Sequence, residues 1–219
     1  MSIKPRQWAK QHTSRSNTYE FNGTKWKVKG SNGGLNKRHL ARLFQQMDVM
    51  LTKYSKVCVI QFDLHMLEYT EDNKKMTIFK RRLFGRTSTK YKINENDIAY
   101  FWCREYEKGK GQHYHWAVIV DGKKVWSGFP INDIAHMVWE NMDGTIHFRD
   151  YHPNVTRTSF EKQREAMDHL SYLAKVRTKG YAGDKVKSFS SSKIQYPDGD
   201  IDNKKGLWSG HETTTTKKS

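Results

Sequence analysis

The sequence predicts an α+β fold in which helices flank a central antiparallel β-sheet. Residues 57–64 form a continuous run of β-branched and apolar residues, which is typical of a central strand. Two further β-like stretches, 98–106 and 112–120, are separated by a short glycine-containing turn at 108–111, which predicts an antiparallel pair. Apolar residues at three- and four-residue steps over 159–179 predict a long helix.

The N-terminal part of the chain is polar and basic. We expect residues 1–30 to be a basic arm that includes two short β-like pieces, 17–21 and 24–30. A glycine-rich break at 31–34 comes before a predicted helix over 36–54. That helix is indicated by the helical spacing of its apolar residues, Leu40, Leu43, Phe44, Met47, Met50 and Leu51.

Weaker elements lie between and after the predicted strands. The pattern over 73–91 favours a helix that Gly85 breaks. Asp121 and Gly122 form a turn dipeptide that closes the strand 112–120. A second helix is predicted over 132–141, and a short β piece follows at 145–148.

The helix over 159–179 has the clearest boundaries. Thr158 is the expected N-cap, with Glu161 reaching back in a capping box. Basic residues occupy its last turn, and Gly180 offers a left-handed stop. Beyond it, 187–193 is expected to be a polar basic loop. We therefore predict one folded domain over 31–196 and a polar, disordered tail over 197–219.

Charge is the strongest feature of the composition. The chain has 39 Lys and Arg against 23 Asp and Glu, a net charge of +16, which points to a polyanionic partner such as nucleic acid. No run approaches the ~20 apolar residues of a membrane helix, and the N-terminus resembles no secretory signal. We expect a cytoplasmic protein with no membrane partner, in which Cys58 and Cys103 are buried free thiols.

Two histidines lie two residues apart in a predicted strand. His113 and His115 therefore project from the same face, and two neutral imidazoles make half of a metal site. Glu105 lies near the end of the neighbouring strand and can approach them across the antiparallel pair. Glu107 has the same face parity as Glu105 and is the alternative ligand.

The ligand types do not determine which metal is bound. A mixed nitrogen and oxygen set suits Mn²⁺ or Mg²⁺. Two imidazoles with one carboxylate also describe the facial triad of non-haem iron oxygenases. That alternative explains neither the basic charge nor the tyrosine of the following helix.

Tyr172 is the candidate nucleophile. At about 100° per residue, the apolar stripe of its predicted helix faces the core and Tyr172 falls on the opposite side. It shares that side with Asp168, His169 and Lys175. A free phenol has a pKa of about 10, so Lys175, one turn on, is expected to stabilise the phenolate or the developing phosphate charge.

These motifs together resemble the HUH endonuclease superfamily, in its rolling-circle replication-initiator branch. The family pattern is matched by His113-Tyr114-His115 and, downstream, by Tyr172-Leu-Ala-Lys175. The string LSYLAKVRTKGY and the later KSFSSSK are most similar to the replication proteins of inoviruses (filamentous phages) and their relatives in bacterial prophages. The resemblance covers roughly residues 36–195 and is a motif-level one.

The resemblance implies a fold and a mechanism. It implies a central antiparallel sheet with the histidines on a middle strand, a bound divalent metal and a covalent 5′-phosphotyrosine intermediate. By position, Glu105 matches the usual third ligand. The tyrosine follows the histidines, as in replication initiators. Tyr172 has no second tyrosine four residues away, since the next one is Tyr181.

The sequence thus predicts a sequence-specific single-stranded DNA endonuclease that initiates rolling-circle replication. Its expected partner is single-stranded DNA at a replication origin. No GxxxxGK[ST] motif is present, so unwinding would need a host helicase, and copying a host polymerase. Two alternatives remain: a transposase or mobilisation protein with the same chemistry, and a non-catalytic DNA-binding regulator.

Overall fold

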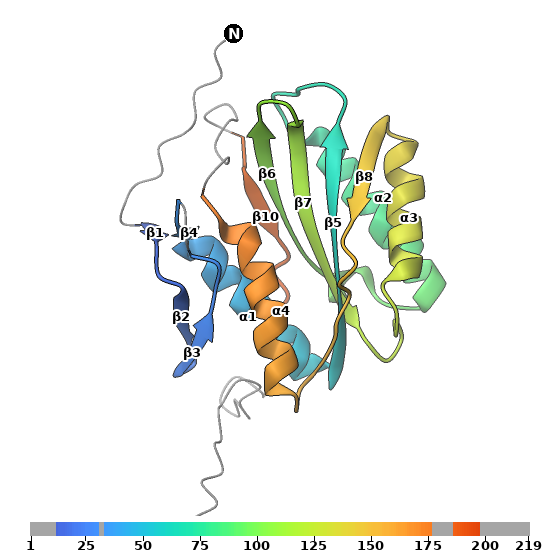
Figure 1. Cartoon of the computed structure of the whole chain (residues 1–219). Coiled ribbons are helices and arrows are strands. Elements are labelled where there is room, and N and C mark those ends of the chain that lie inside the picture. The colour runs from blue at the N-terminus through green and yellow to red at the C-terminus, as the bar shows by residue number, and fades with distance from the viewer. Residues whose placement is uncertain (1–11, 31–32, 177–185, 198–219) are drawn as a thin grey trace, which may run out of the picture.

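A computed structural model describes residues 12–30, 33–176 and 186–197, and its centre is a six-stranded antiparallel sheet (Figure 1). The strand order is β10-β6-β7-β5-β8, and β9 pairs with the first residues of β5. The strands are β5 (Lys56–Met66), β6 (Ala99–Glu107), β7 (Gly111–Asp121), β8 (Gly144–Phe148), β9 (Asn154–Thr156) and β10 (Phe189–Ser191). The predicted α+β fold, with an antiparallel sheet flanked by helices, is confirmed.

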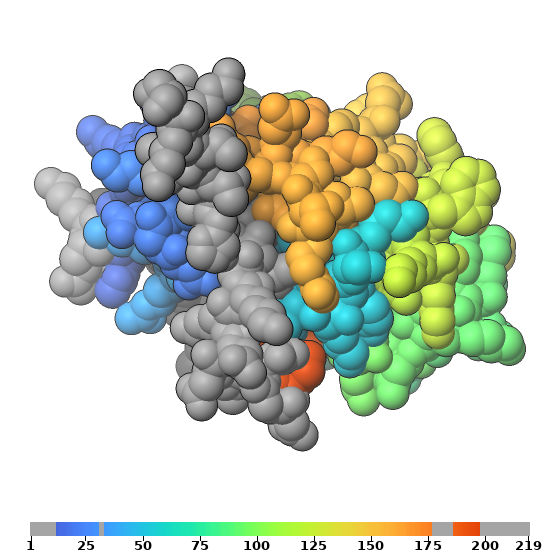
Figure 2. Space-filling view, turned by 90° about the horizontal axis from the view of Figure 1, so that it is seen from below, coloured from blue at the N-terminus to red at the C-terminus, as the bar shows by residue number. Residues whose placement is uncertain are grey.

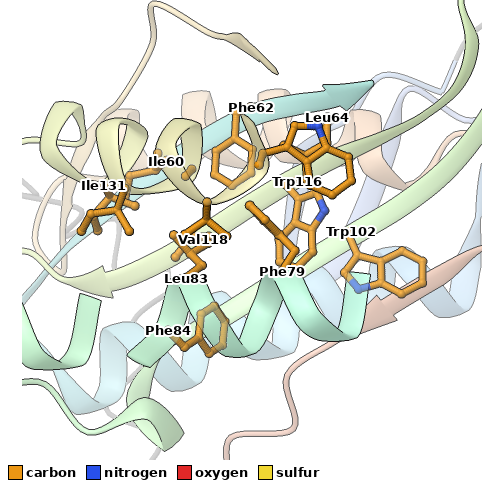
Figure 3. Close-up of a cluster of buried hydrophobic side chains, with 14 of the residues drawn as sticks. Ile60, Phe62, Leu64, Phe79, Leu83, Phe84, Trp102, Trp116, Val118 and Ile131 are labelled. Atoms are coloured by element: carbon orange, nitrogen blue, oxygen red, sulfur yellow. The ribbon is translucent and has the colours of Figure 1, made fainter. Parts of the chain in front are cut away.

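Helices cover both faces of the sheet. One face carries α1 (Lys37–Lys53) and α4 (Phe160–Ser171), and the other carries α2 (Lys74–Tyr91) and α3 (Phe129–Glu140) (Figure 1). Each face has its own hydrophobic core, and Figure 3 shows the one between the sheet and α2 and α3. Because β5 and β7 are covered on both faces, each contains a continuous apolar run, 57–60 in β5 and 116–120 in β7, and the polar residues of the site follow or precede that run.

Residues 12–30 pack against α1 and α4. They contain β1 (Thr13–Ser14) and the hairpin of β2 (Thr18–Phe21) and β3 (Thr24–Lys27), and β1 pairs with β4 (Leu35–Asn36). Trp26 is fully buried and its ring lies 5.7 Å from that of Phe44 and 5.1 Å from that of Phe160. The first eleven residues of the expected basic arm, and residues 198–219 of the expected tail, lie outside the described residues.

Two local predictions about helices are wrong. Gly85 does not break α2, which continues to Tyr91, because one helical glycine costs only about 1 kcal/mol and the buried face of α2 outweighs it. The N-cap of α4 is Ser159 and not Thr158, since the Ser159 side chain accepts a hydrogen bond from the backbone N–H of Lys162.

Other boundaries differ from expectation. The α-helix α4 ends at Ser171, and a single 3₁₀ turn, Tyr172–Ala174, follows it. Its expected last turn and Gly180 lie outside the described residues. Part of the expected loop 187–193 is the strand β10, which forms because it can pair along β6. The helix α3 starts at Phe129, three residues early, with Pro130 in its first turn. Among the described helices, none is long and apolar enough to cross a membrane.

Candidate active site

Glu105, His113 and His115 meet on the face of the sheet that α1 and α4 cover. Glu105 of β6 is the register partner of His113 in β7, and His115 lies two residues further along the same strand. One ligand atom from each residue lies within 4.8 Å of the others, and all three side chains are buried. Glu105 Oε2 is 3.4 Å from Nε2 of His115 and 3.7 Å from Nε2 of His113.

The other ring nitrogen of each histidine has its own partner. Nδ1 of His115 lies 2.6 Å from Oδ1 of Asp63, and Nδ1 of His113 lies 3.2 Å from the carbonyl oxygen of Gly111. An acceptor at Nδ1 keeps the proton on that nitrogen and leaves Nε2 available as a ligand. Both Nε2 atoms thus turn toward the same carboxylate, which is the arrangement of metal-binding histidines.

These residues fit a divalent metal ion. Nε2 of His115 is buried and forms no hydrogen bond within the part of the chain that the structure describes. Two imidazoles and a carboxylate form a donor set used for Mn²⁺, Fe²⁺ and Zn²⁺. Glu107, the alternative ligand, is the register partner of Gly111 and pairs with Lys110 at 3.0 Å in the turn. The geometry therefore favours Glu105 as the third ligand.

Neighbouring charges outweigh burial in setting the pKa values of His115 and Asp63. Burial alone would lower the pKa of His115, but the neighbouring carboxylates of Asp63 and Glu105 outweigh burial and raise it. Burial likewise works to raise the pKa of Asp63, but His115 and Arg149 hold it below its ordinary value. Arg149 donates to Oδ2 of Asp63 at 2.8 Å, so Asp63 stays ionised between a histidine and an arginine.

Tyr172 lies directly over this cluster. Its ring meets that of His115 edge-on, with centroids 5.1 Å apart and planes at 89°. Two cations flank the ring: Lys175 Nζ lies 4.6 Å from its centroid and the Arg149 guanidinium 5.6 Å. Tyr172 is half-buried and lies in the single 3₁₀ turn that follows α4, with its ring against His115 of the sheet.

The neighbours of Tyr172 are partly those expected. His169 and Tyr172 line one small cavity of about 40 Å³, together with His115, Asp63, Arg149 and Lys29. A space of this size admits water but no nucleotide. Asp168 lines a different hollow, with Lys27 and Glu161 among others. The structure therefore brings His115, Tyr172 and Lys175 together and places Asp168 elsewhere.

The phenol of Tyr172 is protonated at neutral pH. Burial, followed by the charge of Glu105, raises its pKa to about 12, and Arg149 acts in the opposite direction. A cation held beside Glu105 would offset the contribution of that carboxylate. The tyrosine is thus poorly activated without a bound cation.

Three residues of the site were not predicted from the sequence. Asp63 and His65 point to the same face of β5, where the His65 ring stacks on that of His113 at 5.4 Å. The sequence did carry a sign of these two residues, because Asp63 and His65 are polar, share the same parity and stand at the end of an apolar run in β5. Arg149 follows β8 and had no signal in the local sequence.

Residues 16–141 match the family model described as YagK/YfjJ C-terminal domain, which is more than half of the chain. The chain belongs to this family. The matched region contains the metal-site candidates Glu105, His113 and His115, and it ends before Arg149 and Tyr172. No curated protein and no solved structure matches the chain.

Proposed function

We propose that this protein is a metal-dependent, single-stranded DNA endonuclease of the HUH type that starts rolling-circle replication from its origin. The observation that carries the proposal is the edge-on contact of Tyr172 with His115, a member of the buried Glu105, His113 and His115 cluster. The net charge of +16 supports a nucleic-acid substrate. We place its action in the cytoplasm of a bacterium or a phage-infected host.

The chain itself supplies a nucleophile and its surroundings. A divalent ion bound by Glu105, His113 and His115 would supply Lewis acidity toward a phosphate oxygen. The Tyr172 phenol loses its proton and its oxygen attacks the scissile phosphorus. The bond from phosphorus to the 3′ oxygen breaks, and that oxygen takes up a proton and leaves as a 3′-hydroxyl. The 5′-phosphate stays on Tyr172, so attack by a 3′-hydroxyl can rejoin the strand.

Two cations, Lys175 and Arg149, assist the phenol of Tyr172. Both cations lie against the ring of Tyr172, where they favour the phenolate and the negative charge that develops on the phosphate. Asp63 holds both His115 and Arg149, so one carboxylate orients the metal site and a charge-stabilising group. Asp63 is therefore a positioning residue.

The decisive experiment is a covalent adduct assay. The protein is incubated with a library of single-stranded DNA and Mn²⁺, and denaturing gels detect protein that carries DNA. We expect an adduct that is lost with a chelator, in Tyr172→Phe and in the double variant His113→Ala with His115→Ala. Tyr181→Phe is the matched control and should keep the adduct. An adduct that survives Tyr172→Phe but not Tyr181→Phe would show that Tyr181 is the nucleophile instead.

Other outcomes identify the alternatives. If the protein forms no adduct but binds DNA in a salt-sensitive way, and a chelator does not change that binding, the protein is a non-catalytic regulator and not a nuclease. Iron-dependent oxygen consumption without an adduct would indicate an oxygenase-type centre. A transposase or mobilisation protein would give the same adduct, and sequencing of the trapped strands would separate it from a replication initiator by the position of the cut. Replication would further require a host helicase and polymerase.

A further inference from the structure

The outer face of α2 is strongly basic. Its 18 residues contain no Asp or Glu, and an 18-residue helix is about 27 Å long. Met76, Phe79 and Leu83 face the core, and five cations of the helix are exposed: Lys74, Arg81, Arg82, Arg86 and Lys90. Lys74 pairs with Asp72 and Arg86 donates to the sulfur of Met137, whereas Arg81 and Arg82 form no ion pair among the described residues.

A groove of about 930 Å³ runs beside this face, between α2 and the segment that contains β10. Lys80 and Arg81 line it from α2, and Lys187 and Lys193 line it from the flanks of β10, with serine hydroxyls between them. At one end, Lys53 is paired with Asp97. The other four cations take part in no ion pair among the described residues and outnumber the one further carboxylate of the lining, Glu95, so the groove has a positive surface.

The groove lies across the sheet from Tyr172. Ser190 is the register partner of Trp102, whose side chain belongs to the core under α2 and α3, and Ser190 Oγ lies 3.3 Å from the hydroxyl of Tyr100. Tyr172 lies over the opposite face, beside α4. Seen from below, the red segment around β10 and the green α2 region lie along one side of the molecule, away from the orange α4 (Figure 2).

The chemistry of the groove suits a phosphate backbone and not unpaired bases. Sites for single strands combine cations with exposed aromatic faces on which bases stack. Two rings line the groove. Phe84 is buried, and Tyr100 is already contacted by Lys80 at 5.0 Å, by Phe84 at 5.6 Å and by Trp116 at 5.8 Å. Cations and hydroxyls without a stacking surface contact phosphates, which carry no base identity.

We propose that the groove between α2 and β10 binds double-stranded DNA through its phosphates, at a site separate from the strand that Tyr172 cuts. Duplex DNA carries about one charge per 1.7 Å along its axis, so a basic helix about 27 Å long faces many phosphates at once. The proposal does not depend on nicking, because it concerns a different face of the sheet.

Binding of a labelled 20-bp duplex, followed by fluorescence anisotropy, tests this site. The full chain carries Tyr172→Phe and the buffer contains EDTA, so that no strand is cut. The groove variant combines Lys80→Glu, Arg81→Glu and Lys193→Glu. The control combines Lys25→Glu, Lys123→Glu and Lys162→Glu, which are exposed positions with the same change in charge. Circular dichroism confirms that both variants remain folded.

We expect the groove variant to lose about 30-fold or more in duplex affinity at ~0.1 M salt, and its salt slope to fall by about 2 to 3. The control should change less than about threefold. When Tyr172 is kept and Mn²⁺ is present, the groove variant should still form the covalent adduct with single-stranded DNA. Equal losses in both variants would reduce the effect to net charge and overturn the proposal, as would an unchanged duplex affinity. If the unmodified chain forms no adduct, the proposed nuclease activity is refuted, and the duplex-binding measurement still tests the groove.

Discussion

Oδ1 of Asp63 lies 2.6 Å from Nδ1 of His115, and this contact joins the second carboxylate of the site to the histidine pair. It holds the ring of His115 with Nε2 turned toward Glu105. Because the contact comes from β5 and the histidine from β7, it depends on the pairing of two central strands.

Asp63→Asn should weaken Mn²⁺ binding by about 10- to 100-fold, because an outer carboxylate fixes the tautomer and orientation of a ligating histidine. Isothermal titration calorimetry measures the change. Asp48→Asn is the control, since Asp48 is similarly buried but lies on α1 and bonds with Tyr196. Equal Mn²⁺ affinity in Asp63→Asn and the unmodified chain would contradict the role given to Asp63.

Glu105→Gln and Glu107→Gln separate the two candidate ligands. We expect Glu105→Gln to lower Mn²⁺ affinity by more than about 100-fold, since it removes a ligand instead of an outer partner. Glu107→Gln should leave it within about threefold, because Glu107 pairs with Lys110 in the turn. The same calorimetric titration decides, and the reverse order of effects would assign the ligand to Glu107.

Arg149→Met should slow adduct formation by about 10²- to 10³-fold, the range for removing one group that stabilises developing charge. The rate is measured in single-turnover assays with saturating Mn²⁺, so that weaker metal binding does not limit it. Arg164→Met removes a cation from the ring of Phe160 and is the control. A rate equal to that of the control would show that Arg149 serves only the structure of the site.

Metal binding should weaken as the pH falls. The pKa of His115 is raised by Asp63 and Glu105, so its protonated form persists to higher pH than in a free histidine. A proton on Nε2 excludes the metal, and affinity is therefore full above this raised pKa and lost by about tenfold per pH unit below it. Titrations with Mn²⁺ between about pH 5.5 and 8.5 measure the affinity, and an affinity independent of pH would refute the assignment.

Trp26→Ala should lower the free energy of unfolding by about 3–5 kcal/mol, because the indole is fully buried between Phe44 and Phe160. Urea unfolding followed by circular dichroism measures the loss. Lys25→Ala changes an exposed side chain next to it and should stay within about 0.5 kcal/mol. A similarly small loss for Trp26→Ala would mean that the β2–β3 hairpin contributes little to the folded domain.

Most of the fold could be predicted because its elements have strong local patterns. The run 57–64 and the turn at 108–111 predict β5 and the pairing of β6 with β7. The missed elements are those with weak patterns of their own. β10 is three residues long and exists only because β6 offers it an edge. Gly85 is tolerated because the helix around it is anchored by tertiary packing.

The sequence by itself determined the centre of the candidate site. Side-chain alternation places His113 and His115 on one face, and the short turn before β7 brings two candidate carboxylates near them, Glu105 and Glu107, of which the strand register sets Glu105 opposite His113. Only the tertiary structure decided which groups complete it. The pairing of β5 with β7 and β8 and the packing of α4 bring Asp63 and Tyr172 to His115 and bring Arg149 to Asp63. The longest-range of these contacts, Arg149 with Asp63, joins residues 86 positions apart. Local periodicity depends on near neighbours in the chain and carries no information about such contacts.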